Sequence, residues 1–230
     1  MKILFILNNY FGTGDGLSAS ARRTVQALRD VGQEVRVVTG SNRDPAGPKP
    51  DYELKWFYFP IVQPIIDAHG YCFASTDTKI IEEAMRWADV IHMEEPFVLE
   101  ARAYRIAQRL WKPVTGTYHL HPENVFCSLG LGWSKVANYL LITAWRDLVF
   151  NHCSHLQCPT ENVCERLERH HFKSKLHVIS NGLVPDTCIR PEVPPEDYLD
   201  PARPLNVLYI GRLSVEKDQP TLIRAIRHYL

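Results

Sequence analysis

Short apolar runs alternate with helical repeats along most of this chain, and this alternation limits its fold more than any other feature. Between the runs, apolar residues recur three or four positions apart, as at Leu17, Ala21, Val25 and Leu28, which is typical of one face of a helix. The apolar runs are Lys2–Leu7, Glu34–Thr39, Glu53–Phe59, Asp89–Met93, Lys112–Tyr118, Ser154–Cys158 and Lys175–Ile179. Strands and helices that alternate in this way predict an α/β fold with a doubly wound parallel sheet.

The overall composition excludes several classes of protein. With 45% hydrophobic and 23% charged residues the chain is typical of a globular protein. Lys plus Arg and Asp plus Glu are 26 each, so no net field favours a nucleic-acid partner. We find no run of about 18 apolar residues that would predict a membrane span. The apolar start leads into Asn8 and a loop, which indicates a first core strand rather than a signal peptide.

The six cysteines do not form a disulfide or zinc pattern. Cys153, Cys158 and Cys164 lie close in sequence to His152 and His155, but without paired metal-ligand spacing. Cysteine within an apolar strand usually acts as a small hydrophobe. We therefore expect no metal and a reduced, cytoplasmic protein.

An apolar run near the end of the chain is followed directly by cations. Leu205–Ile210 leads into Gly211, Arg212 and Lys217, and a helical pattern then opens at Pro220. We expect a buried strand, a short loop and a helix, so that both cations lie where a strand ends and a helix begins. In α/β sheets this crevice binds ligands, and the helix N-terminus favours an anion. The pattern predicts an anion site, and a diphosphate fits it best.

Gly211-Arg212-Leu213, then Glu216-Lys217, with Asn181-Gly182 about thirty residues earlier, resembles the donor-binding pattern of retaining GT-B glycosyltransferases of family 4. The resemblance implies two Rossmann-like domains, of which this chain would hold the first and the opening βα unit of the second. It implies transfer of a sugar from a nucleotide-diphosphate donor to a hydroxyl of a sugar or lipid-linked acceptor, with retention. It also implies that Arg212 and Lys217 bind the donor diphosphate without a metal ion or other cofactor.

The loop after the first strand contains Gly12, Gly14 and Gly16. Gly14-x-Gly16-x-x-Ala19 matches a dinucleotide fingerprint, which keeps an NAD-linked oxidoreductase open as an alternative. Six residues separate the first strand from Gly14, however, and Thr39-Gly40 occupies the place of the expected acidic residue.

The same loop resembles the mobile loop of the glycosyltransferase family. That resemblance implies that Gly14 and Gly16 lie near the donor diphosphate. It places Gly12 and Asp15 on the acceptor side. A flexible surface loop without a site remains the other interpretation.

Two histidines leave the carboxyl end of the predicted strand Lys112–Tyr118. They are His119 and His121, with Glu123 close behind. Ligands bind at this end of the strands in a doubly wound sheet. The position resembles the strand-end histidine of the family, so we assign the catalytic role first to His119 and then to His121. His92, which also ends a strand, is expected to support them.

The predicted helix Trp133–Phe150 carries aromatic residues and a few cations. We favour a helix that packs on the core or faces another domain. A helix of this kind would also suit a membrane surface. The interpretation leaves contact with the inner face of the membrane open.

Residues 185–204 contain six prolines and five acidic residues, a linker composition. We predict an N-terminal acceptor-side domain at 1–184, this linker, and the start of a nucleotide-sugar-binding domain at 205–230. One βα unit cannot bury its own apolar faces, so we expect a truncated transferase with little or no activity of its own. A non-catalytic binding module is the remaining alternative.

Overall fold

The computed structural model describes residues 1–68, 71–127, 132–182, 207–211 and 217–229. Its contacts divide the chain into two units, Met1–Asn181 and Gly182–Leu230. Residues 185–204, where we predict the linker, lie outside the described residues, so the linker's exact bounds stay a prediction.

The first unit is built on a seven-stranded sheet in which every pairing is parallel. The strands are β1 (Lys2–Ile6), β2 (Glu34–Gly40), β3 (Tyr52–Leu54), β6 (Val90–Met93), β7 (Val114–Thr117), β8 (His155–Cys158) and β9 (Lys175–Val178). Their order is β3-β2-β1-β6-β7-β8-β9. The chain therefore steps outward from β1 to β3 and returns to the other side of β1 at β6. This confirms the predicted doubly wound α/β fold and places its switch point between β1 and β6.

One predicted strand is divided in the structure. Glu53–Phe59 was expected to form a single strand, whereas β3 ends at Leu54 and Trp56–Phe57 forms β4. β4 pairs antiparallel with β5 (Phe73–Ala74) in a small separate sheet. The chain changes sheets at Lys55, which a run of apolar and aromatic letters does not reveal.

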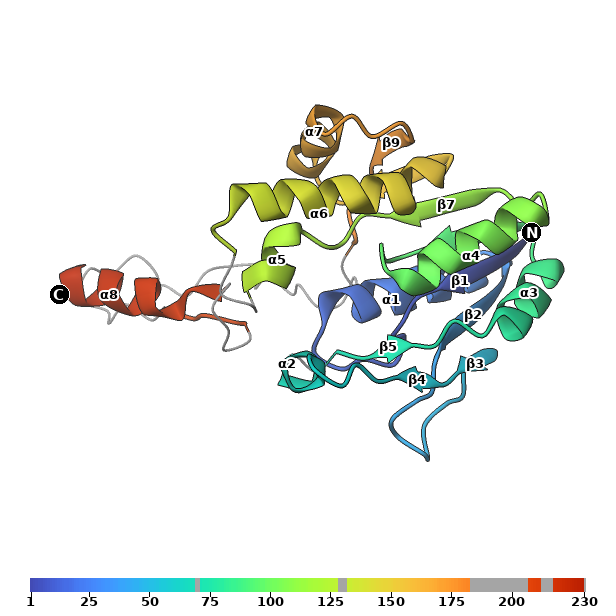
Figure 1. The fold of residues 1–230 in the computed structure, drawn as a ribbon. Coiled ribbons are helices and arrows are strands. Elements are labelled where there is room, and N and C mark those ends of the chain that lie inside the picture. The colour runs from blue at the N-terminus through green and yellow to red at the C-terminus, as the bar shows by residue number, and fades with distance from the viewer. Residues whose placement is uncertain (69–70, 128–131, 183–206, 212–216, 230) are drawn as a thin grey trace, which may run out of the picture. The chain divides into compact units, whose positions relative to one another are not determined.

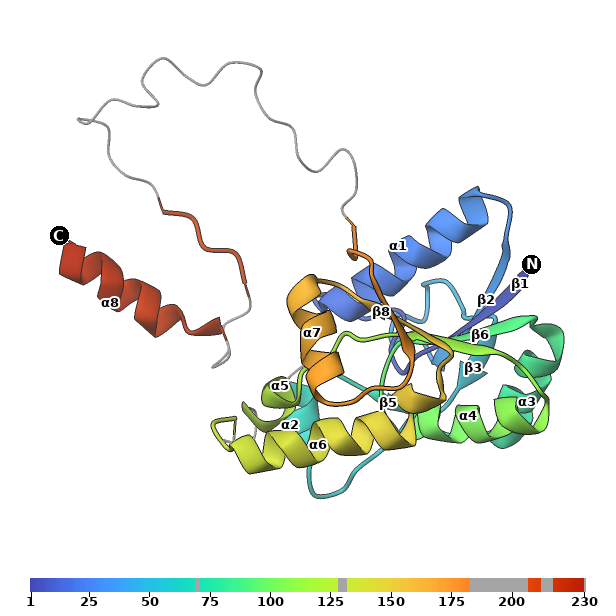
Figure 2. The ribbon, with the colours of Figure 1, turned by 90° about the horizontal axis from the view of Figure 1, so that it is seen from above.

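Helices cover the two faces of the large sheet (Figures 1 and 2). The helices of the first unit are α1 (Gly16–Asp30), α2 (Gln63–Ala68), α3 (Thr78–Trp87), α4 (Val98–Arg109), α5 (Pro122–Cys127), α6 (Lys135–Leu148), the 3-10 turn η1 (Phe150–His152) and α7 (Glu161–Arg169). α1 packs its Ala21 and Val25 against Ile3, Phe5 and Leu7 of the first strand region. The other face forms a larger core with α3, α4 and α6. Because side chains alternate along a strand, β1 contributes to both cores.

On the α1 side of the sheet, the strands β6, β7 and β8 present polar residues, whereas β1 presents apolar ones. These polar residues are His92, Thr115, Thr117, His155 and Gln157, whereas their sequence neighbours lie in the apolar core on the other face. Parallel strands are usually apolar on both faces. Here the outer half of the sheet keeps one polar face, which runs to the carboxyl ends of the strands.

The second unit contributes α8 (Gln219–Tyr229) among the described residues. This confirms the predicted helix at the end of the chain. The strand expected at Leu205–Ile210 is wrong for the described part, since Val207–Ile210 form no strand and are exposed. A strand needs a hydrogen-bonded neighbour, and no described residue pairs with these.

Candidate functional site

The carboxyl ends of β1, β6 and β7 bring polar residues together at the switch point of the sheet. Asn8 follows β1, Glu94 and Glu95 follow β6, and His119 follows β7. Pairing of Ile6 with Met93 and of Met93 with Gly116 sets these ends side by side. The sheet topology therefore assembles a site from segments that are distant in sequence, since Asn8 and Glu95 are 87 positions apart and Glu94 and His119 are 25 apart.

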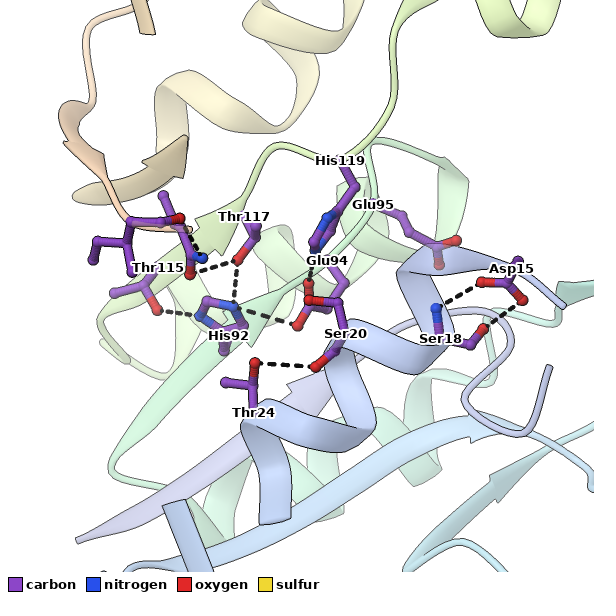
Figure 3. A network of polar contacts seen from close by, with 12 residues as sticks. Asp15, Ser18, Ser20, Thr24, His92, Glu94, Glu95, Thr115, Thr117 and His119 are labelled. Carbon is purple, nitrogen blue, oxygen red and sulfur yellow. Dashed lines mark hydrogen bonds and ion pairs between the residues drawn. The ribbon is translucent and has the colours of Figure 1, made fainter. Parts of the chain in front are cut away.

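Glu94 is the centre of a buried network that includes His119 and His92 (Figure 3). His119 Nε2 lies 2.7 Å from Glu94 Oε2, and His92 Nε2 lies 3.6 Å from Glu94 Oε1. The side chain of His119 is 6% exposed and that of Glu94 is 2% exposed. The ring of His92 also contacts Thr115 Oγ1 at 2.9 Å and Thr117 Oγ1 at 3.0 Å.

The charges of this network follow from burial and pairing. Burial alone would raise the pKa of Glu94, but the hydrogen bond from His119 and the charges of both histidines outweigh it, so its pKa lies below the ordinary value. Burial lowers the pKa of His92, which Glu94 offsets only in part. An ionised Glu94 requires a proton on His119 Nε2. In the tautomer that carries its single proton on Nε2, Nδ1 of His119 is a hydrogen-bond acceptor.

His121 lies in a different environment from His119. Its Nδ1 is 3.3 Å from Arg166 Nη1, and the Arg166 guanidinium donates to Glu123 Oε1 at 2.7 Å. Burial and the Arg166 charge together lower the pKa of His121. The structure thus places the two candidate histidines at one strand end but in separate networks.

Asn8 holds the strand ends together from the buried side of the site. Its backbone amide donates to Glu95 Oε2 at 2.5 Å and its Nδ2 to the same oxygen at 2.9 Å. Nδ2 also lies 3.4 Å from Glu100 Oε1, while Asn8 Oδ1 accepts from the amide of Ala74. Tyr71 donates its hydroxyl hydrogen to Glu95.

Glu95 and Glu100 are both fully buried and both contact Asn8 Nδ2. Burial raises the pKa of both carboxyls, and their mutual repulsion raises that of Glu100 further. Burial also raises the pKa of the Tyr71 hydroxyl, and the neighbouring Glu95 adds to this effect. The pKa values of the adjacent residues Glu94 and Glu95 are consequently shifted in opposite directions, because only Glu94 faces imidazoles.

The glycine loop ends in a well-formed helix cap. Asp15 Oδ1 accepts from the amide of Ser18 at 2.6 Å, and the Ser18 hydroxyl contacts Asp15 Oδ2 and the Asn9 carbonyl. Arg22 Nη1 donates to the carbonyls of Tyr10 at 2.6 Å and Gly12 at 2.9 Å. Asp15, which we assigned to the acceptor side from the resemblance, thus serves as the N-cap of α1.

The three glycines of this loop have unlike surroundings. A Cβ at Gly12 would lie 2.3 Å from Asp15 Oδ2 and 2.8 Å from Ser18 Oγ, so a side chain there would force these groups to move. Gly14 has a φ of 89°, which favours glycine. A Cβ at Gly16 would meet nothing within 4 Å. The space above the first turn of α1 is therefore open on the side of Gly16.

The two cations assigned to the donor diphosphate are in the second unit. Arg212 lies outside the described residues, and Lys217 is described and exposed. The carbonyl of Lys217 accepts from the Tyr209 hydroxyl at 2.8 Å.

The central residue of the network, Glu94, was not assigned a role from the sequence. It follows β6 directly, His119 lies two residues after β7, and the order of the strands makes these two ends neighbours. Position after a strand was therefore the available indication. Pairing between β6 and β7 could not be read from the alternation alone.

Comparison with known proteins identifies the family. Residues 14–187, which are most of the chain, match the sequence pattern of the family described as Glycosyltransferase Family 4. The chain belongs to glycosyltransferase family 4. The resemblance inferred from the sequence is thereby confirmed.

An alpha-monoglucosyldiacylglycerol synthase from Streptococcus pneumoniae (strain ATCC BAA-255 / R6) is 25% identical to the chain over 242 residues. The match covers 100% of the chain and 53% of that protein. The chain thus spans about half the length of this curated relative.

The solved structures that resemble this chain are more distant from it in sequence. A UDP-GlcNAc 2-epimerase from Methanocaldococcus jannaschii matches 77% of this chain and 45% of its own, with 15% identity and a TM-score of 0.49. An S. aureus MnaA–UDP structure matches 74% of this chain and 42% of its own, with 13% identity and a TM-score of 0.45. No functional conclusion follows from similarity at this level.

The helices and the possible metal ligands of the described residues bear on the predicted membrane contact and site. None of the helices there is long and apolar enough to cross a membrane. Nor does that part of the chain contain three or more His, Cys, Asp or Glu side chains grouped to hold a metal ion.

Proposed function

We propose that this chain is the acceptor-side part, with the start of the donor-side part, of a retaining transferase that moves a sugar from a nucleotide-diphosphate donor to a hydroxyl acceptor. The observation that supports this most directly is His119, hydrogen-bonded to the buried Glu94 at the carboxyl edge of the sheet. By itself the chain would have little or no activity, because it spans only about half of its curated relative.

The proposed reaction exchanges one bond at the anomeric carbon. The oxygen of the acceptor hydroxyl forms a bond to that carbon on the face from which the diphosphate leaves. The bond from the anomeric carbon to the diphosphate oxygen breaks, and its electron pair stays with that oxygen. The acceptor proton passes to the departing phosphate, so no metal ion and no separate general base are required. Arg212 and Lys217 would neutralise the leaving diphosphate.

His119 would orient a hydroxyl group of the sugar or the acceptor. With Nε2–H donated to Glu94, Nδ1 is the atom that remains to accept a hydroxyl hydrogen. Glu94 thereby fixes both the tautomer and the orientation of the ring. In this proposal His121, which contacts Arg166 instead, has a secondary role.

The N-terminus of α1 would contribute to binding of the diphosphate. The amides of Gly16 and Leu17, in the first turn of α1, have no acceptor among the described residues, since Asp15 caps Ser18 and accepts from Ala19. Helix N-termini favour anions. The open space beside Gly16 supports a role for Gly14 and Gly16 near the phosphates.

We also propose a lipid acceptor and peripheral contact with the inner face of the membrane. The streptococcal relative is named for a glucosyl diacylglycerol product. Val136 and Leu140, in the first half of α6, are 70% and 61% exposed, and Trp133, just before this helix, is 80% exposed. An exposed apolar stripe of this kind suits an interfacial helix. This extends the alternative that the sequence left open for the same helix.

Binding and turnover test the proposal separately. UDP-glucose, and then bicelles that contain diacylglycerol, would be titrated into the ¹⁵N-labelled chain while its amide resonances are followed. We expect weak binding that shifts the amides of Gly14, Gly16 and His119. The variant His119→Gln keeps a donor for Glu94 and should lose these shifts. The control His155→Gln, at the start of β8, should retain them.

Release of UDP from UDP-glucose in the presence of diacylglycerol would be measured on the same preparations. We expect turnover to be absent or far below that of complete family members. Turnover at their level would overturn the proposal that the chain is an incomplete part. If both probes leave the loop amides and His119 unshifted, the proposed site is wrong.

A further inference from the structure

A groove lies at the amino edge of the sheet, at the opposite end of the strands from the site described above. It has a volume of about 590 Å³, within the range of small-molecule sites. It is lined by Tyr104, Gln108, Trp111, Lys112, Pro113, Val114, His152 and Ser154. The lining comes from the end of α4, the start of β7 and η1.

Trp111 is the most unusual residue of this groove. It is 93% exposed, and large aromatic side chains are seldom left in solvent. Its φ is 55° at the position just after α4, where its amide donates to Gln108 and that of Lys112 to Ala107. Glycine is favoured at such a helix end. Trp111 therefore combines a strained, left-handed backbone conformation with an indole that is exposed to solvent.

Two stacked rings form the wall beside Trp111. The rings of Tyr104 and His152 are parallel to within 5°, with centroids 4.0 Å apart. Because each ring covers one face of the other, their polar edges remain available to a ligand. Neither the Tyr104 hydroxyl nor the ring nitrogens of His152 have a hydrogen-bond partner within the described part of the chain.

The polar groups of the groove are suited to a neutral ligand. Lys112 is the sole cationic side chain among the lining residues, and its Nζ is already committed to the carbonyl of Ala88 at 2.5 Å. Tyr104, Gln108 and His152 each both donate and accept hydrogen bonds. No lining residue carries an acidic side chain. Groups that both donate and accept match sugar hydroxyls, while the apolar C–H face of a pyranose stacks on an indole.

We infer that this groove is a second carbohydrate site, which binds a neutral pyranoside by stacking on Trp111 and by hydrogen bonds to Tyr104 and His152. It lies at the edge of the sheet away from His119, so it does not belong to the transfer site. It would hold part of a glycan, or a glycosylated surface, without reacting with it. The inference does not depend on the proposed transferase activity.

Saturation-transfer NMR with maltose as the probe tests the inference on the intact chain. We expect transfer to the ring protons of maltose, and its loss in Trp111→Gly. Glycine fits the φ of 55°, so this variant should fold at least as well as the wild type. Tyr104→Ala should weaken the transfer at least several-fold. Trp133→Ala removes another exposed indole outside the groove and should leave the transfer unchanged.

Thermal unfolding would verify that each variant is folded. No transfer to maltose from the wild type, or equal transfer from Trp111→Gly, would overturn the inference. Transfer to adenosine but not to maltose would also overturn it, because the groove would then select planar aromatic ligands. None of these outcomes alters the expectation for His119, so the two proposals fail independently.

Discussion

Two glycines four residues apart should respond to the same substitution with opposite signs. Alanine at Gly12 would place its Cβ 2.3 Å from Asp15 Oδ2 and 2.8 Å from Ser18 Oγ. Both groups would have to move, which breaks the cap on the Ser18 amide and the hydrogen bond of the Ser18 hydroxyl. Loss of a cap costs about 1 kcal/mol and loss of a buried hydrogen bond about 1 kcal/mol. We expect Gly12→Ala to lower the free energy of unfolding by about 2 kcal/mol.

Gly16→Ala provides the matched control. A Cβ there meets nothing within 4 Å, and its φ is not in the left-handed region. Alanine restricts the unfolded chain more than glycine, so we expect a gain of about 0.5 kcal/mol. Urea unfolding followed by circular dichroism measures both values.

A double-mutant cycle sharpens this test. In the Asp15→Ala background the carboxylate that obstructs the new Cβ is absent, so Gly12→Ala should cost about 1 kcal/mol less than in the wild type. Changes of the same sign at Gly12 and Gly16, or additive effects of Gly12→Ala and Asp15→Ala, would refute this account of the loop.

The remaining predictions concern buried groups of the first unit. The Tyr118 hydroxyl is buried without a hydrogen-bond partner among the described residues, so Tyr118→Phe should raise the free energy of unfolding by about 1 kcal/mol, and a loss would show that the hydroxyl is satisfied. Pairing lowers the pKa of Glu94 from 4.5, so its contribution to stability is present above pH 4.5 and is lost on acidification below it; Glu94→Gln should flatten that limb of a stability–pH curve. Burial raises the pKa of Glu100, so the folded state holds its proton longer and stability falls as pH rises above 4.5; Glu100→Gln should remove this fall, and an unchanged slope would contradict the assignment. Burial raises the pKa of Cys153 to about 12, so iodoacetamide should modify the half-buried Cys127 in the native protein and Cys153 only after unfolding, as mass spectrometry of the labelled peptides would verify.

Much of the fold was predictable because local periodicity reports burial directly. The helix at the glycine loop, for instance, was expected from Leu17 onward and begins at Gly16. The division of Glu53–Phe59 between two sheets was not predictable, since strand pairing depends on residues distant in sequence. The strand expected at Leu205–Ile210 was wrong for its described part, Val207–Ile210, for a related reason, because an apolar run forms a strand only beside another strand.

The candidate site was predictable in part. His119 was identified because it follows a strand, and the structure adds the buried Glu94 that orients it. Asp15 illustrates the limit of this approach. The resemblance of the glycine loop to that of the family assigned Asp15 to the acceptor side, and the structure adds that its oxygens accept from the amide and hydroxyl of Ser18. Side chains that cap a helix and side chains that bind a ligand share the same residue types.

The polar face of the outer strands has a consequence for how the molecule opens. β1 packs against apolar side chains on both faces of the sheet, whereas β8 and β9 do so on one face. Amide protons of β9 should therefore exchange with solvent through partial openings that leave β1 closed. His92 and Glu94 stand at the border between these two halves. On the β1 side the site would thus be held by strands that open rarely, and on the β8 and β9 side by strands that open more readily. The second side could then adjust to a bound substrate without disturbing the first.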